Sequence, residues 1–176
     1  MGKGSKLNVK LIAFTAIMGA LGNILGLFSI VIPSPLLHLE LHLSQLTPLL
    51  VGIAIGPKYG AITGALSLIV VTIKIKNPLI PLGNAILAGV AGLAARKFRP
   101  VIAGLIGEIA ETPFIWFSVI LWAGIIGGLP IDVLTPIITL ICIKAFFEVL
   151  VSSVIVELLL KIPEIRRALD SLKTLD

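Results

Sequence analysis

Long runs of apolar side chains dominate this chain, and their lengths predict helices that cross a membrane. A helix rises ~1.5 Å per residue, so about 20 apolar residues cross the ~30 Å hydrocarbon core of a bilayer. The second run is short because Gly56-Pro57 ends it, and we expect this helix to be tilted or partly re-entrant. A short amphipathic tail begins at Pro163. The runs predict six transmembrane helices, at residues 7–31, 45–56, 58–76, 78–95, 100–126 and 133–161.

One segment departs from this pattern. In LLHLELHLSQL, residues 36–46, leucine alternates with His38, Glu40, His42 and Ser44. A period of two predicts an extended, strand-like piece rather than a helix. The segment lies between the first two predicted helices. Its leucines would pack onto the helix ends, while its polar edge would face water or a vestibule.

The polar edge of this segment allows two interpretations. Alternate residues of a strand lie ~6.6 Å apart, so neighbours such as His38 and Glu40 could share a metal ion. His38 and His42 could share an ion only if the segment were helical, because an extended segment separates them by ~13 Å. The second interpretation is a lid over a binding site, since an ordered amphipathic loop needs something to cover. We favour the lid and expect no bound metal.

Composition supports a membrane location. The 176 residues are 57% hydrophobic and 13% charged, whereas a soluble domain is about half apolar and about a quarter charged. The basic start MGKGSKLNVK resembles that of a signal peptide. The apolar run after it is longer than the ~7–15 residues of a signal sequence, so we expect a retained first helix. We predict an all-α, multi-pass protein of the cell membrane, with residues 1–176 forming a single transmembrane domain.

The basic residues predict the orientation. Cytoplasmic ends of membrane helices carry an excess of Lys and Arg. If both termini are cytoplasmic, Lys74 and Lys76 lie outside, Lys144 lies within the last helix, and residues 36–46 form an outer loop. The net charge of +5 then reflects topology, and we expect no nucleic-acid partner. Eleven of the fourteen basic residues would be cytoplasmic: Lys3, Lys6, Lys10, Lys58, Arg96, Lys97, Arg99, Lys161, Arg166, Arg167 and Lys173.

Small residues predict where helices approach closely, because helices in lipid associate through such faces. Gly60 and Gly64, four residues apart, form one such pair, and we expect Gly89, Gly92, Gly104 and Gly107 to act similarly. In the first helix, Ala13, Ala16 and Ala20 share one face, and Gly19 would widen this smooth strip. The strip suits either an internal neighbour or a partner's helix. Packing alone favours the internal neighbour.

Ionisable residues within the predicted helices are candidates for function, because they are costly in a membrane. Glu111 and Lys144 each lie ~16 Å along their helices, near mid-membrane. Lys144 and Glu148, four residues apart, share a face and can pair. Glu111, Lys144 and Glu148 could therefore meet, either to bind a ligand or to fix helix register. Asn84 and Trp116 are further candidates in the outer half.

Sequence signatures of catalysis do not occur in this chain. It contains no G-x-x-x-x-G-K-[ST], no G-x-S-x-G and no H-E-x-x-H. Both histidines lie in residues 36–46. An enzyme would have to be built from Glu108, Glu111 and Lys144, so we predict that the chain is not an enzyme and needs no cofactor.

Together these features resemble the substrate-binding S components of energy-coupling factor (ECF) transporters. The likeness covers about residues 7–161. It rests on six helices with cytoplasmic termini, on Ala16-x-x-x-Ala20, and on LSQLTPLLVGIAIGPKYGAITGAL at 43–66, with its GP-x-x-G turn at Gly56, Pro57 and Gly60.

The resemblance implies a function. S components capture a vitamin or related micronutrient with high affinity and dock on a shared module of one transmembrane coupling protein and two ATPases. The substrate class would be riboflavin, thiamine or a thiamine precursor. The alternatives are a small membrane enzyme using Glu108 and Glu111, or a metal-uptake subunit using His38, Glu40 and His42.

The resemblance also implies roles for individual residues. The docking face would be Ala13, Ala16 and Ala20. Residues 36–46 would be the lid over a site in the outer half. The residues expected to bind substrate are His38, Glu40, His42, Asn84, Glu111, Trp116, Lys144 and Glu148.

Overall fold

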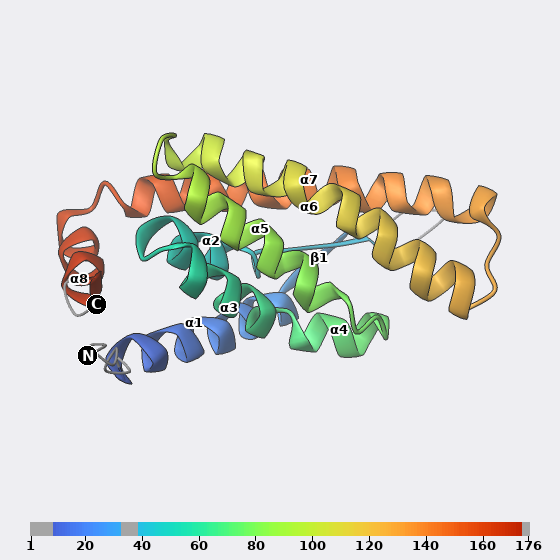
Figure 1. The fold of residues 1–176 in the computed structure, drawn as a ribbon, viewed down its shortest axis with the longest axis horizontal. Helices are drawn as coiled ribbons and strands as arrows, with labels where there is room; N and C mark the ends of the chain where they lie inside the picture. Colours follow the sequence, from blue (N-terminus) through green and yellow to red (C-terminus); the bar gives the residue numbers. More distant parts are fainter. Residues whose placement is uncertain (1–8, 33–38, 174–176) are drawn as a thin grey trace, which may run out of the picture.

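The computed structural model describes residues 9–32 and 39–173, and within them the chain is mainly helical (Figure 1). The long helices α6 and α7 lie side by side along the long axis of the molecule. A short hairpin of two strands interrupts the helices. In chain order the elements are α1 (Val9–Leu27), β1 (Ser29–Ile32), β2 (Leu39–His42), α2 (Leu46–Ala54), α3 (Pro57–Ser67), α4 (Ile69–Ile75), α5 (Ile80–Ala94), α6 (Pro100–Val119), the π-helix η1 (Ile120–Ile126), α7 (Ile131–Leu159) and α8 (Pro163–Lys173).

Every predicted apolar run contains a helix, but the lengths of the helices separate them into classes. Within the described residues, three helices are long and apolar enough to cross a membrane: α1, α6 continued through η1, and α7. A fourth span results if α3 and α4 count as one, with a 41° bend between them. The helix α5 is shorter, and α2 has only nine residues. The short second run at 45–56 thus corresponds to a helix of about two and a half turns.

The first predicted helix is too long by four residues. It was expected to reach residue 31, but α1 ends at Leu27, and Ser29–Ile32 forms β1. This strand pairs antiparallel with β2, with Ser29 opposite His42 and Val31 opposite Glu40. Ile30, Val31 and Ile32 are β-branched and favour a strand. Pairing also satisfies backbone groups that apolar surroundings would leave without partners.

The alternating segment is extended, as its period of two predicted, over Leu39–His42. Its first residues, 36–38, lie outside the described part of the chain. Its last residue, Leu46, already begins α2. The polar edge is therefore part of a hairpin rather than of a lone strand.

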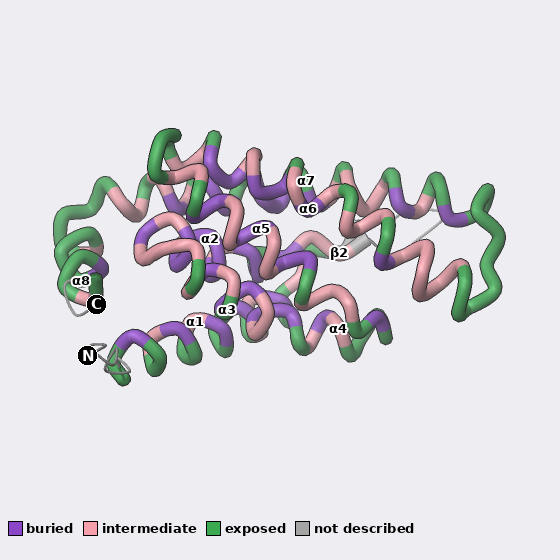
Figure 2. The backbone as a smooth tube through the Cα atoms, in the orientation of Figure 1, coloured by how far each residue is buried: buried purple, intermediate pink, exposed green. Residues whose placement is uncertain are grey.

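Glycines bring the central helices into contact, as the small-residue pairs predicted. A Cβ placed on Gly64 of α3 would overlap the main chain at Asn84 of α5, and one on Gly60 would overlap Gly52 of α2. Gly107 of α6 is similarly close to Leu87 of α5. The centre of the bundle is buried in consequence (Figure 2). Its apolar core includes Leu49, Leu87, Ala91, Val149 and Val156.

The alanine face of α1 points away from the bundle, so the internal neighbour that packing alone favoured is wrong. Ala13, Ala16 and Ala20 are all exposed. Gly19 does not widen their strip, because it is buried on the opposite face, where a Cβ would lie 2.6 Å from Leu66 Cβ. The face of α1 that packs inward consists of Leu11, Thr15, Gly19, Gly22 and Gly26.

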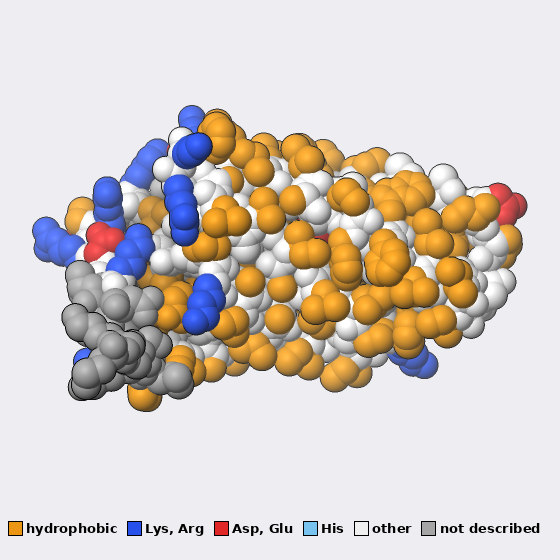
Figure 3. All heavy atoms as spheres, in the orientation of Figure 1, with side chains coloured by type: hydrophobic (Ala, Val, Ile, Leu, Met, Phe, Trp, Pro, Cys, Tyr) orange, Lys and Arg blue, Asp and Glu red, His pale blue; other side chains and the backbone are white. Residues whose placement is uncertain are grey.

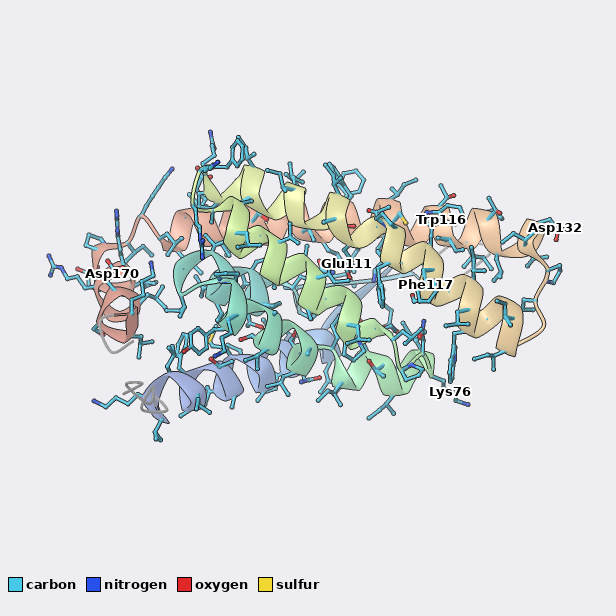
Figure 4. All side chains as sticks on the ribbon, in the orientation of Figure 1. Lys76, Glu111, Trp116, Phe117, Asp132 and Asp170 are labelled. Carbon is cyan, nitrogen blue, oxygen red and sulfur yellow. The ribbon has the colours of Figure 1, made fainter. Side chains whose placement is uncertain are left out.

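Charge is distributed unevenly along the molecule. Lys and Arg side chains gather at the end that carries α8, and the middle of the visible surface is mainly hydrophobic (Figure 3). Lys76, which directly follows α4, lies toward the opposite end (Figure 4). A surface with an apolar middle and one basic end suits a protein embedded in a membrane.

Candidate functional site

A cavity of about 390 Å³ lies between the hairpin and the helices. Residues of β2, α4, α5, α6 and α7 line it, so five elements of the chain contribute to its walls. Its size falls within the ~300–1,000 Å³ typical of small-molecule sites. Most of the wall is apolar, including Val71, Ile80, Phe114 and Ile141. The ionisable side chains in the wall are Glu40, His42, Lys74, Glu111, Lys144 and Glu148.

Lys144 and Glu148 form the ion pair that their spacing predicted. Lys144 Nζ lies 3.3 Å from Glu148 Oε1, on one face of α7. The same oxygen accepts a hydrogen bond from the main-chain N–H of His42 at 2.7 Å. Glu148 thus joins the end of β2 to the middle of α7, and it closes one side of the cavity.

The His42 ring is neutral at neutral pH. Burial first, and then the positive charge of Lys144, lower the pKa of His42 from its ordinary value of 6.5 to about 4. Its Nδ1 lies 2.8 Å from Ser44 Oγ, within hydrogen-bond distance. Nδ1 also lies 3.6 Å from Glu148 Oε1, but a neutral ring makes no ion pair there. Among the described residues, the cation that balances Glu148 is therefore Lys144.

Glu40 attaches the hairpin to α4. Its Oε2 accepts a hydrogen bond from Ser29 Oγ at 2.9 Å and lies 3.4 Å from Lys74 Nζ. The Ser29 hydrogen bond and the Lys74 charge lower the pKa of Glu40. This pair is partly exposed, with 38% of the Glu40 side chain accessible. Glu40 and Lys74 are thus a charged pair in the wetter part of the cavity wall.

Glu111 is held on the α6 side of the cavity, in the middle of the bundle (Figure 4). It is 6% exposed, and its carboxyl lies against Gly83 of α5, where a Cβ would come within 2.7 Å of Oε1. Its other oxygen, Oε2, has no hydrogen-bond partner among the described residues. The structure therefore brings Glu111, Lys144 and Glu148 to one cavity, with Glu111 differing from the other two in lacking an ion-pair partner there.

Glu108 lies apart from this group. It is one turn from Glu111 on α6, yet it lines a separate hollow of about 300 Å³ with Thr112 and Cys142. Both of its carboxylate oxygens are buried and lack partners among the described residues. Glu108 thus lines this hollow, whereas Glu111 lines the larger cavity.

Three predicted binding residues are not among the described residues of the cavity wall. Asn84 is fully buried, and its Nδ2 donates to Gly64 O at 3.0 Å and to Ser67 Oγ at 2.9 Å, which ties α5 to α3. Trp116 interacts with the side chain of Cys142 on α7. His38 lies outside the described residues.

The sequence analysis missed several wall residues. Phe114 follows Glu111 by one helical turn, so the spacing on α6 was a usable signal. Lys74 was assigned only to topology, because nothing local indicates that it would reach Glu40. Within residues 9–32 and 39–173, no group of three His, Cys, Asp or Glu side chains is arranged to hold a metal ion.

Comparison with known proteins gives a match among solved structures. No family profile matches the chain, and no curated protein sequence matches it. Its structure is similar to the solved structure of the S component of a bacterial ECF transporter, with a TM-score of 0.62 and 21% sequence identity. The match covers 93% of this chain and 98% of the other. At this identity the likeness establishes a shared fold along nearly the whole chain.

Proposed function

We propose that this protein is the substrate-capturing subunit of an ECF-type importer and holds a small organic micronutrient in the cavity beneath the hairpin. The observation that carries the proposal is the cavity itself. It is of ligand size and mostly apolar, and it contains a few charged side chains brought together from distant segments. The fold shared with an ECF S component supports the same conclusion.

The proposed topology has six membrane-crossing segments with both termini in the cytoplasm of a multi-pass protein of the cell membrane. The crossings are α1, α2, α3 with α4, α5, α6 with η1, and α7. The gathering of Lys and Arg at one end supports this orientation. The hairpin then faces outward, so the cavity takes its ligand from outside the cell.

Under this proposal, partner chains supply the energy for transport. The sequence has no phosphate-binding loop, and we propose that the protein is not itself an enzyme. The exposed face of Ala13, Ala16 and Ala20 would dock on a transmembrane coupling protein that associates with two ATPase subunits. A smooth face of small residues allows a partner helix to approach closely.

The proposed substrates are vitamins with a flat ring system, namely riboflavin, thiamine or a thiamine precursor. Phe114 and the aliphatic side chains of the wall would cover the ring, and the charged groups would orient its polar substituents. His42, Glu40, Glu111, Lys144 and Glu148 are the predicted binding residues that line this cavity.

Native mass spectrometry of the protein, purified gently from cells grown in rich medium, tests the proposal. We expect one bound small molecule of vitamin mass, which identifies the substrate directly. A protein that is empty after purification, and remains empty after incubation with a panel of vitamins, contradicts the proposed function.

A further inference from the structure

The charged side chains around the cavity form two ion pairs, and one carboxylate belongs to neither pair. Of the described residues in the wall, three are carboxylates and two are lysines, and His42 is neutral at neutral pH. Lys74 pairs with Glu40, and Lys144 pairs with Glu148. Glu111 has neither lysine as a partner.

Glu111 is more deeply buried than Glu40 and has fewer contacts than Glu148. It is 6% exposed, and its Oε2 has no hydrogen-bond partner among the described residues. A buried carboxylate without a partner is costly, and a positive group brought to it would remove that cost. Because Glu111 lines the cavity, a bound ligand can supply this group.

The lysines of the wall are poorly placed to bind an anionic ligand. Lys144 is the deeper of the two, and its ammonium is engaged by Glu148, whose oxygen also holds the His42 N–H. An anion that recruited Lys144 would leave Glu148 as a second uncompensated buried carboxylate. Breaking such a pair is unfavourable.

We propose that the ligand is an organic cation, a protonated amine or a cationic heterocycle, whose positive part contacts Glu111. Its apolar body would lie against Phe114, Val71 and Ile80. This inference rests on the proposed function and narrows it, because it distinguishes among micronutrients by charge. It also separates the role of Glu111, which contacts ligand, from that of Glu148, which is satisfied within the protein.

Three vitamins of fixed charge serve as probes: thiamine, a quaternary cation; riboflavin, which is uncharged; and biotin, an anion. Each is titrated by calorimetry into the full chain in detergent. We expect thiamine to bind at least thirtyfold more tightly than the other two. We also expect Glu111→Gln to weaken thiamine binding at least thirtyfold, the scale of losing one partner of a buried charge pair. Glu157→Gln is the control, because Glu157 pairs with Arg99 at 2.9 Å and does not line the cavity.

The outcomes separate this inference from the proposed function. If riboflavin or biotin binds as tightly as thiamine, or if Glu111→Gln binds thiamine as the unaltered chain does, the inference is overturned while ligand capture stands. If none of the three binds, the inference and the vitamin class of the proposed function both fail. If Glu111→Gln does not fold, competition among the three probes for the unaltered chain decides by itself whether the ligand is a cation.

Discussion

The main-chain N–H of His42 donates to Glu148 Oε1 at 2.7 Å, which joins the hairpin to α7 across 106 residues of sequence. Because the donor is the backbone, this link does not depend on the side chain at position 42. It depends on the carboxyl at position 148, which Lys144 holds in place. The end of the hairpin at His42 is thus tethered to α7 through Glu148.

Replacing Glu148 should loosen the hairpin. In Glu148→Ala, the His42 N–H loses its acceptor and Lys144 loses its partner, and removing one member of a buried pair costs ~3–5 kcal/mol. We expect amide hydrogen exchange in Leu39–His42 to rise at least tenfold, measured by mass spectrometry. His42→Ala is the matched control, because it retains the main-chain hydrogen bond and should change exchange far less. Equal exchange in the two variants would contradict the link.

Acid should destabilise the protein through His42. Its pKa is about 4 when folded and 6.5 ordinarily, so between these values the unfolded chain binds more protons than the folded one. Stability therefore falls as the pH is lowered from about 6.5 toward 4, and it rises in the opposite direction. Thermal unfolding in detergent between pH 7 and 4.5 measures this. In His42→Gln the decline over that window should be smaller, and an unchanged decline would exclude His42 as its source.

Asn23 should stabilise the break between α3 and α4. Its Nδ2 donates to Leu66 O at 2.6 Å, and its Oδ1 accepts from Val70 N at 2.9 Å, on the two sides of the bend. Backbone groups left without partners in apolar surroundings are costly. Asn23→Ala should lower the free energy of unfolding by about 1–3 kcal/mol, measured by denaturation in detergent. The exposed neighbour Ile24, changed to Ala, should have little effect, and similar losses in both variants would refute this role.

Two glycines of α5 offer a matched steric test of the cavity. A Cβ on Gly83 would lie 2.7 Å from Glu111 Oε1 and 3.3 Å from Phe114 Cδ1. Gly83→Ala should therefore displace the Glu111 carboxyl and weaken ligand binding at least tenfold, about 1.4 kcal/mol by calorimetry. A Cβ on Gly89 meets Ala61 Cβ at an ordinary 3.4 Å, so Gly89→Ala should bind as the unaltered chain does. Equal affinities in both variants would count against a ligand contact at Glu111.

The alanine face of α1 should affect assembly but not ligand binding. Ala16→Trp or Ala20→Trp would place a bulky ring on a face directed away from the bundle. We expect the variants to bind ligand normally and to lose co-purification with the coupling protein. Ile109→Trp is the control, because Ile109 is 68% exposed on a different helix. Normal assembly of both alanine variants would show that partners dock elsewhere.

Much of the arrangement could be read from local pattern. Apolar length predicted helix in each of the six runs, although the run at 58–76 is divided into α3 and α4 by a 41° bend. The period of two predicted the extended Leu39–His42. Spacing of four predicted the Lys144–Glu148 pair, because a helix fixes the relative direction of its own side chains. The predicted membrane depths of Glu111 and Lys144 are similar, and Glu111 lines the same cavity as the Lys144–Glu148 pair.

Other features of the structure depend on how whole helices are rotated and packed against one another. Helical periodicity showed that Ala13, Ala16 and Ala20 share a face, but only packing of the opposite face against Leu66 decided that the alanines point outward. Helix packing likewise decided that Glu108 lines a separate hollow and that Asn84 lies between α3 and α5.

The sequence by itself determined the apolar helices, the uneven charge and the groups that share a face, because these follow from spacing along one chain. Only the tertiary structure decided that β1 pairs with β2, that Lys74 reaches Glu40, and that Glu111 lacks a partner in the described cavity wall. Each of these depends on contacts between residues distant in sequence, and such contacts are set by the rotation and packing of whole elements.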